Sequence, residues 1–182
     1  MDGSIVHILA GIMSLPQYVK QYHDDKAERL ARCPGCGRAN PRFHGCYSRK
    51  SDRINPPSES LNLIFIQRYY CPGCGKTCSV LPECIPPVRW YLWETQQAAI
   101  LLFWLQGSAR AVEKQITPSR HTIKRWVAWL IVQFKSHKNT LCTHFPSLGL
   151  LTDPIGFWKH VFDKLSLSTA MRLCHVAGVA IP

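Results

Sequence analysis

The sequence predicts an α+β protein in which a small antiparallel ribbon, closed by cysteines, precedes a mostly helical region. The string Cys-Pro-Gly-Cys-Gly occurs twice, at residues 33–37 and 71–75. Strand-like segments lie between the two copies, and beyond residue 86 apolar residues recur at helical spacing. A chain of 182 residues is long enough for one ordinary domain or two small ones. We expect four segments: N-terminal helical 1–31, ribbon 32–86, helical 87–138 and C-terminal helical 139–182.

The N-terminal segment predicts a cytoplasmic protein with no membrane partner. Residues 1–13 lack a basic start and are interrupted by His7 and Gly11, so they do not resemble a signal peptide. The same run is too short to span a bilayer. A reducing cytoplasm favours metal-bound thiols over disulfides for the nine cysteines. Ser14 is the expected N-cap of a helix over 15–31. Its expected packing residues are Leu15, Tyr18, Val19, Tyr22 and Leu30.

The repeated cysteine string predicts one structural zinc ion. A Cys-x-x-Cys turn presents two thiolates from one loop, so two such turns complete a tetrahedral shell. Gly37 and Gly75 follow the second cysteine of each turn and suit a positive φ. A disulfide pair or a redox Cys-x-x-Cys is the alternative, which the duplicated, glycine-flanked turn disfavours. The expected zinc ligands are Cys33, Cys36, Cys71 and Cys74.

The segment between the cysteine turns predicts two strands, over 42–49 and 61–70, separated by the turn residues 55–58. The second segment is apolar on both faces, so we expect helices to cover the sheet. Prolines at 82, 86 and 87 mark the expected exit from the ribbon. Three cysteines remain, and for these a buried packing thiol is the favoured role, with a substitute metal ligand as the alternative. These are Cys46, Cys78 and Cys84.

Residues 93–134 predict three helices in a helix-turn-helix arrangement. The first spans 93–106 and ends at Gly107, and Ser108 caps a short second helix that runs to residue 116. Thr117 and Pro118 are the expected cap and first residue of the third helix. That helix carries one continuous apolar stripe. The stripe consists of Ile123, Trp126, Val127, Leu130 and Phe134. A short helix, a tight turn and a helix with basic residues at its start are typical of DNA-binding helix-turn-helix proteins.

The charge distribution predicts a polyanionic partner. Residues 32–53 hold six Lys and Arg against one acid, and residues 107–138 hold seven against one. These two windows account for the whole net charge of +11. Long polar side chains near the start of the third helix can reach base edges and phosphates. The expected double-stranded DNA contacts are Arg110, Ser119, Arg120, His121, Lys124 and Arg125. A plain three-helix packing unit with a basic surface is the alternative.

The last 44 residues are the least informative. Asp153 and Pro154 predict a helix start, and a second short helix is expected after Ser168. Two Cys-His groupings invite comparison with a second metal site, but their spacing fits no zinc pattern, so core thiols and surface histidines are expected. These residues are Cys142, His144, Cys174 and His175.

The order of these features resembles the zinc-ribbon and helix-turn-helix region of bacterial insertion-sequence transposases and their short relatives. The likeness covers roughly residues 30 to 135. It is carried by residues 68–82 (Arg-Tyr-Tyr-Cys-Pro-Gly-Cys-Gly-Lys-Thr-Cys-Ser-Val-Leu-Pro), 107–112 (Gly-Ser-Ala-Arg-Ala-Val) and 117–126 (Thr-Pro-Ser-Arg-His-Thr-Ile-Lys-Arg-Trp). Cys78 departs from the family, which usually has an aromatic residue there. The resemblance implies a bacterial, nucleoid-associated protein, with a transposase or a second copy of the chain as a further partner.

We expect DNA binding without catalysis. A catalytic transposase needs a carboxylate triad that holds two divalent metals. Only Asp153 and Asp163 follow the predicted helix-turn-helix. The favoured function is therefore an accessory or regulator of a mobile element. An RNA-binding or ribosome-associated zinc protein and a protein–protein adaptor stay open as alternatives.

Overall fold

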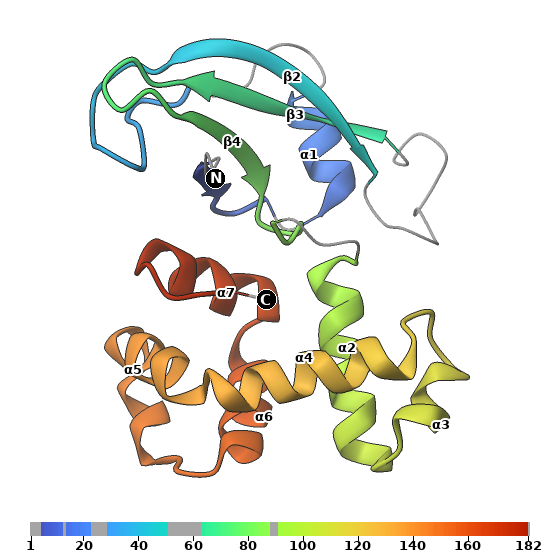
Figure 1. The fold of residues 1–182 in the computed structure, drawn as a ribbon. Helices are drawn as coiled ribbons and strands as arrows, with labels where there is room; N and C mark the ends of the chain where they lie inside the picture. Colours follow the sequence, from blue (N-terminus) through green and yellow to red (C-terminus); the bar gives the residue numbers. More distant parts are fainter. Residues whose placement is uncertain (1–4, 13, 23–28, 51–62, 88–90, 182) are drawn as a thin grey trace. The chain divides into compact units, whose positions relative to one another are not determined.

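The computed structural model describes residues 5–12, 14–22, 29–50, 63–87 and 91–181 of the chain. The chain divides into two compact units, unit 1 (Met1–Tyr91) and unit 2 (Leu92–Pro182). Unit 1 carries a mixed β-sheet and unit 2 is helical, so the protein belongs to the α+β class (Figure 1). The four segments expected from the sequence remain a prediction, although residues from the first two share one sheet.

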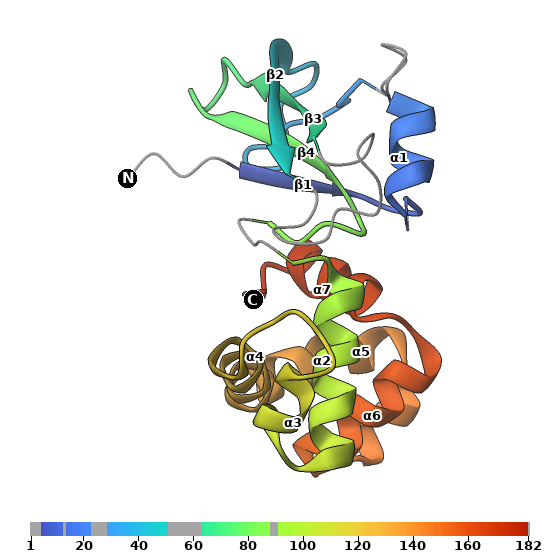
Figure 2. The ribbon, with the colours of Figure 1, turned by 90° about the vertical axis from the view of Figure 1, so that its right-hand side faces the viewer.

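Unit 1 is built on a four-stranded sheet with strand order β1-β4-β3-β2. The strands are β1 (Ile5–Leu9), β2 (Arg42–Lys50), β3 (Leu63–Tyr70) and β4 (Thr77–Pro82). β2 and β3 pair antiparallel, as do β3 and β4, whereas β1 pairs parallel to β4. β1 lies along the edge of the sheet beside β4 (Figure 2). The two predicted strands are thus present, but the described sheet has two strands more than the predicted ribbon.

No strand was predicted from the sequence for residues 5–9 or 77–82. β4 lies between β1 and β3, and all its residues after Thr77 are buried. A strand buried on both faces shows no polar alternation, so periodicity does not reveal it. β1 has a similarly unpatterned sequence, and among the described strands it pairs with β4 alone. The Pro82 at the end of β4 pairs with Leu9, at the last position of the ladder.

The N-terminal helix is shorter than predicted. α1 covers Leu15–Tyr22, and residues 29–31 are not helical. Residues 23–28 of the predicted helix lie outside the described part. Leu15 and Tyr18 are buried as expected, and the Tyr18 hydroxyl donates a hydrogen bond of 2.7 Å to the Phe65 carbonyl. Leu30 packs from outside the helix, in a cluster with Tyr69, Cys78 and Val80.

Unit 2 contains six α-helices and one 3-10 helix within residues 92–181. They are α2 (Trp93–Gln106), α3 (Ala109–Glu113), α4 (Arg120–Val132), α5 (Phe134–His144), η2 (Pro146–Leu150), α6 (Pro154–Lys164) and α7 (Leu167–Val176). Its core holds the fully buried Phe157 and Trp158 of α6 and Leu130 of α4. The Trp158 indole donates to the Leu130 carbonyl at 3.3 Å. Over the described residues, no helix combines the length and apolar character needed to cross a lipid bilayer.

Capping side chains set the starts of several helices in unit 2, and some helix ends differ from those predicted from the sequence. Ser108 caps α3 as predicted, but α3 ends at Glu113. Ser119, not Thr117, caps α4, because its hydroxyl accepts from the Thr122 N–H. Asp153 caps α6 as predicted, whereas α7 starts at Leu167 under a Ser166 cap.

The predicted apolar stripe of the third helix divides between two helices. α4 buries Ile123, Trp126, Val127 and Leu130. Phe134, the last member of the stripe, opens α5 and packs edge-to-face on Phe157 with ring centroids 5.3 Å apart. α5 itself was not expected.

Candidate metal centre and candidate nucleic-acid interface

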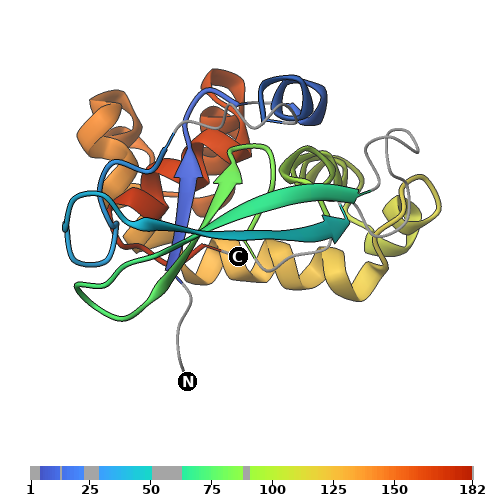
Figure 3. The same ribbon diagram turned by 90° about the horizontal axis from the view of Figure 1, so that it is seen from above.

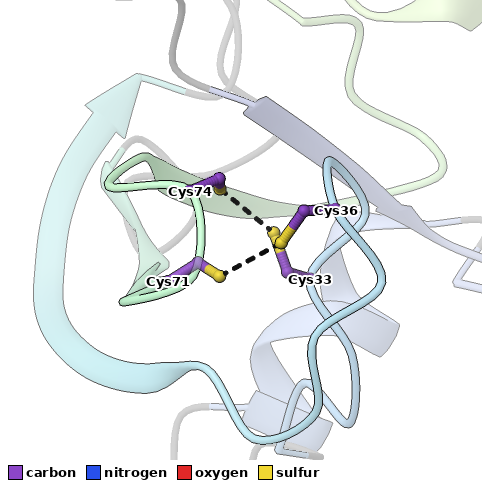
Figure 4. A group of neighbouring side chains, drawn as sticks. All are labelled: Cys33, Cys36, Cys71 and Cys74. Atoms are coloured by element: carbon purple, nitrogen blue, oxygen red, sulfur yellow. Dashed lines mark hydrogen bonds between the residues drawn. The ribbon is translucent and has the colours of Figure 1, made fainter.

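The two cysteine turns bring four thiols together. The ligand atoms of Cys33, Cys36, Cys71 and Cys74 all lie within 4.8 Å of one another (Figure 4). The Cys33 and Cys74 sulfurs are 3.8 Å apart, and those of Cys36 and Cys71 are 3.5 Å apart. A tetrahedral ion with metal–sulfur bonds of about 2.3 Å requires sulfurs about 3.8 Å apart. The four cysteines are therefore placed to bind one metal ion.

The two turns have the same backbone geometry. The N–H of Gly37 donates to the Cys33 carbonyl at 2.8 Å, and the N–H of Gly75 donates to the Cys71 carbonyl at 2.9 Å. The φ angles of these glycines are 73° and 69°. A side chain at such a φ strains the backbone, which explains why glycine follows each second cysteine. Each turn thus fixes its own pair of sulfurs through local hydrogen bonds.

The glycine inside the second turn allows the two turns to approach each other. A Cβ atom on Gly73 would lie 2.6 Å from Arg38 Cδ and 3.3 Å from Arg38 Cβ. Arg38 directly follows the first turn, so its side chain packs against the backbone of the second turn. Gly73 therefore serves close packing between the turns, whereas Gly75 serves the local turn conformation.

Two thiols of the cluster have opposite pKa shifts. Burial acts to raise the pKa of Cys71, but hydrogen bonds with the Cys74 backbone, the Cys36 side chain and the Gly73 backbone lower it to about 6. The Arg38 backbone acts to lower the pKa of Cys36, but its side-chain bond to Cys71 and burial raise it to about 11. A cation bound between the sulfurs would favour the thiolate form of both.

The other cysteines lie apart from the cluster. Burial raises the pKa of Cys78, Cys84 and Cys174 to about 12 in each case, as expected for packing thiols. Cys46 is exposed on β2. Within the described ranges, the four-cysteine cluster is the one grouping of three or more His, Cys, Asp or Glu suited to a metal. The Cys142 and His175 regions thus give no second cluster there.

The residues predicted to contact DNA gather at the start of α4 and on α3. Ser119 caps α4, and Arg110 lies on α3. The remaining four occupy the first two turns of α4: Arg120, His121, Lys124 and Arg125. All six residues are exposed. α2, α3 and α4 pack on one another, which fixes α4 against the rest of unit 2.

The acid in this region has a structural role. The Glu113 carboxylate accepts a hydrogen bond of 3.0 Å from the Arg120 N–H, at the positive end of the α4 dipole. Arg110 and Lys114 line an open depression of about 350 Å³ together with Ser108, Ala111 and Gln115. The sequence prediction did not include Lys114. Its position four residues after Arg110, within the predicted second helix, was the available signal.

The fold and site together define a protein with a four-cysteine metal centre on a mixed sheet, followed by a helical unit. The chain belongs to the family described as "Domain of unknown function (DUF6431)", whose model matches residues 33–126. The match begins at the first cysteine of the cluster and includes all six residues predicted to contact DNA. The description of the family assigns it no function, and the match does not show a transposase family. No curated protein and no solved structure matches the chain.

Proposed function

We propose that this chain is a zinc-stabilised DNA-binding protein that reads duplex DNA through α4. It would serve a mobile element as an accessory or regulator, as its resemblance to transposases implies. The observation that carries the proposal is the division of α4 into two faces. Arg120, Lys124 and Arg125 are exposed on one side, and the opposite side is buried in unit 2.

This division matches what a recognition helix requires. Ile123, Trp126, Val127 and Leu130 hold α4 at a fixed angle, so the exposed side chains are presented from a rigid support. Arginine binds guanine edges through two hydrogen bonds, whereas lysine neutralises phosphate. The short α3, the connecting turn and α4 follow the helix-turn-helix order, with Arg110 of α3 and Lys114, which directly follows α3, available for the DNA backbone.

Zinc is the metal that suits the cysteine cluster best. Four thiolates at tetrahedral spacing favour zinc, and two Cys-x-x-Cys turns are the usual source of such a shell. The thiolates are all used as ligands in this arrangement, so the role proposed for zinc is structural.

The proposal excludes catalysis of strand transfer by this chain. After α4 the acids are Asp153 and Asp163, and the Asp153 carboxylate is hydrogen-bonded to the Gly156 N–H as the cap of α6. Two-metal phosphoryl transfer needs several carboxylates around one point.

The proposal is tested by selecting sequences from a random duplex pool with the full chain. We expect a defined motif, and binding of its duplex to weaken about 5- to 150-fold in Arg120→Ala if that residue reads a base. Lys124→Ala is expected to lower the salt dependence of binding by about one phosphate contact. Lys159→Ala, which removes an exposed lysine on α6, is the matched control and should leave affinity unchanged.

The competing functions predict other outcomes. Preference for structured RNA over any duplex DNA would favour an RNA-binding protein. A lack of binding to every nucleic acid at low salt would favour a protein–protein adaptor. Equal losses of thermal stability and affinity in Arg120→Ala would show that the residue supports folding, which contradicts the role proposed for α4.

A further inference from the structure

One face of the β2–β3 ladder exposes large aromatic side chains. Residues paired across antiparallel strands share a face, and here the pairs are Phe43 with Tyr69, Cys46 with Gln67, Ser48 with Phe65 and Lys50 with Leu63. Phe43 and Phe65 are 55% and 59% exposed, whereas Ile64 and Ile66 on the opposite face are 1% and 0% exposed. The two strands lie side by side, with α1 to one side of the sheet (Figure 3).

The exposed Phe43 ring is held in place by its neighbours. Phe43 packs edge-to-face on Tyr69 with ring centroids 5.8 Å apart. The Tyr69 hydroxyl donates to the Gln67 side-chain oxygen at 2.9 Å, which fixes the ring on which Phe43 rests. Phe65 lies four residues before Tyr69 on β3, so the positions of the two phenylalanines are about 13 Å apart along the strand. A single protein surface therefore presents two separated, flat aromatic faces.

Cations flank this face, and the described part of unit 1 has little acid to neutralise them. Lys50 lies on the face beside Leu63, and both are exposed. Leu30 packs on Tyr69 at the other end of the face, and the exposed Arg29 directly precedes Leu30, so a second cation lies near that end. Among the described residues of unit 1, Glu83 is the one acid, and it is 2% exposed.

We propose that this face, defined by Phe43, Phe65, Arg29 and Lys50, binds single-stranded nucleic acid by base stacking. Unpaired bases stack on exposed aromatic rings while cations follow the phosphate backbone. A duplex offers no free base faces, so this site differs in ligand from the α4 surface and does not rest on the function proposed for α4. The charge complementarity favours a nucleic acid over an apolar protein partner, which would leave the cations unpaired.

The test measures binding of the full chain to a labelled oligothymidylate and oligouridylate of about 16 nucleotides, a length within known site sizes. Phe43→Ala and Phe65→Ala are each expected to weaken binding about 5- to 150-fold, and Phe65→Tyr to retain it. Leu63→Ala is the matched control. Leu63 is 54% exposed on the same face, but it has no aromatic ring on which a base can stack. This variant should change affinity by less than about twofold. The two oligonucleotides distinguish DNA from RNA.

Several results would overturn the inference. Unchanged affinity in both phenylalanine-to-alanine variants would overturn it. An equal loss of affinity in Leu63→Ala would also overturn it, because that result indicates a general apolar surface or self-association. Thermal melts and metal content check that each variant is folded. If the alanine variants do not fold, photo-crosslinking of wild-type protein to bromodeoxyuridine decides: the expected crosslinks lie in peptides of β2 and β3, and crosslinks confined to α4 contradict the inference.

The two proposals fail separately. Arg120→Ala should weaken duplex binding and leave oligothymidylate binding unchanged. Loss of single-strand binding in that variant would assign both activities to α4 and contradict the inference about the sheet. If the wild-type chain binds single strands but no duplex, that result would instead contradict the function proposed for α4.

Discussion

Replacing one cysteine of the cluster is expected to unfold unit 1, and replacing another exposed cysteine is not. Cys36 and Cys46 are both exposed and both belong to unit 1. Only Cys36 has its sulfur in the cluster, 3.5 Å from that of Cys71. Cys36→Ser and Cys46→Ser therefore make the same chemical change, but only Cys36→Ser removes a metal ligand.

The expected effect of losing the metal is large relative to the stability of such a unit. The two turns are separated by 34 residues, and closing a loop of that length costs about 3 kcal/mol in chain entropy. A structural zinc contributes roughly 10–16 kcal/mol of apparent binding free energy in small domains. A domain of this size has a total stability of about 5–15 kcal/mol. Loss of the ion therefore removes an amount comparable to the whole stability of unit 1.

The measurement combines metal analysis with unfolding of the full chain. Wild type and Cys46→Ser should each contain about one zinc, and Cys36→Ser far less. In Cys36→Ser, unit 1 should lose the spectroscopic signals of its tertiary structure and become sensitive to protease. Far-ultraviolet circular dichroism should persist, because unit 1 has one described helix of eight residues whereas α2 of unit 2 alone has fourteen. Equal metal content and equal melting of the two variants would refute the metal centre.

Two further predictions concern unit 2. Burial lowers the pKa of His137 although its ring is hydrogen-bonded to the Ala180 carbonyl, so the folded state takes up this proton less readily than the unfolded chain. The free energy of unfolding should therefore fall as the pH drops below about 6.5. Urea melts at two pH values should show a smaller fall for His137→Phe than for wild type. An identical fall in the two proteins would contradict the role given to His137. Asp153→Ala removes the cap of α6 and should cost about 1 kcal/mol in the free energy of unfolding, measured against Asp163→Ala, an exposed residue of the same helix that is not its cap. A cost no greater than that of the control would show that the cap is dispensable.

The cysteine turns were predictable because their geometry is local. Two thiolates three residues apart and a glycine with positive φ are encoded within each five-residue string, and the structure brings the two strings together. The sheet was predicted in part, because β1 and β4 are defined by partners distant in sequence. Ile5 pairs with Cys78, and no local pattern specifies that parallel contact.

Helix α4 shows a similar limit at its ends. Its apolar face was predictable from spacing, since Ile123, Trp126 and Leu130 recur at helical intervals. Its first residue was not, because Thr117 and Ser119 are both suitable caps and tertiary packing decides between them. Pro118 lies in the bend before the helix and is buried there, and Ser119 is the cap.

The roles of two acids in the fold bear on the proposal of a polyanionic partner. Glu113 accepts from the Arg120 N–H at 3.0 Å, and Glu83 accepts from the Gly11 N–H at 3.0 Å. Both carboxylates are thus used to satisfy backbone groups and to fix the chain. Acids used in this way hold the fold without covering the exposed guanidinium and ammonium groups of α4. Phosphate groups can supply the missing negative charge and release bound counterions as they do so. We therefore propose a nucleic-acid partner before a protein partner, which would need an acidic surface matched to α4.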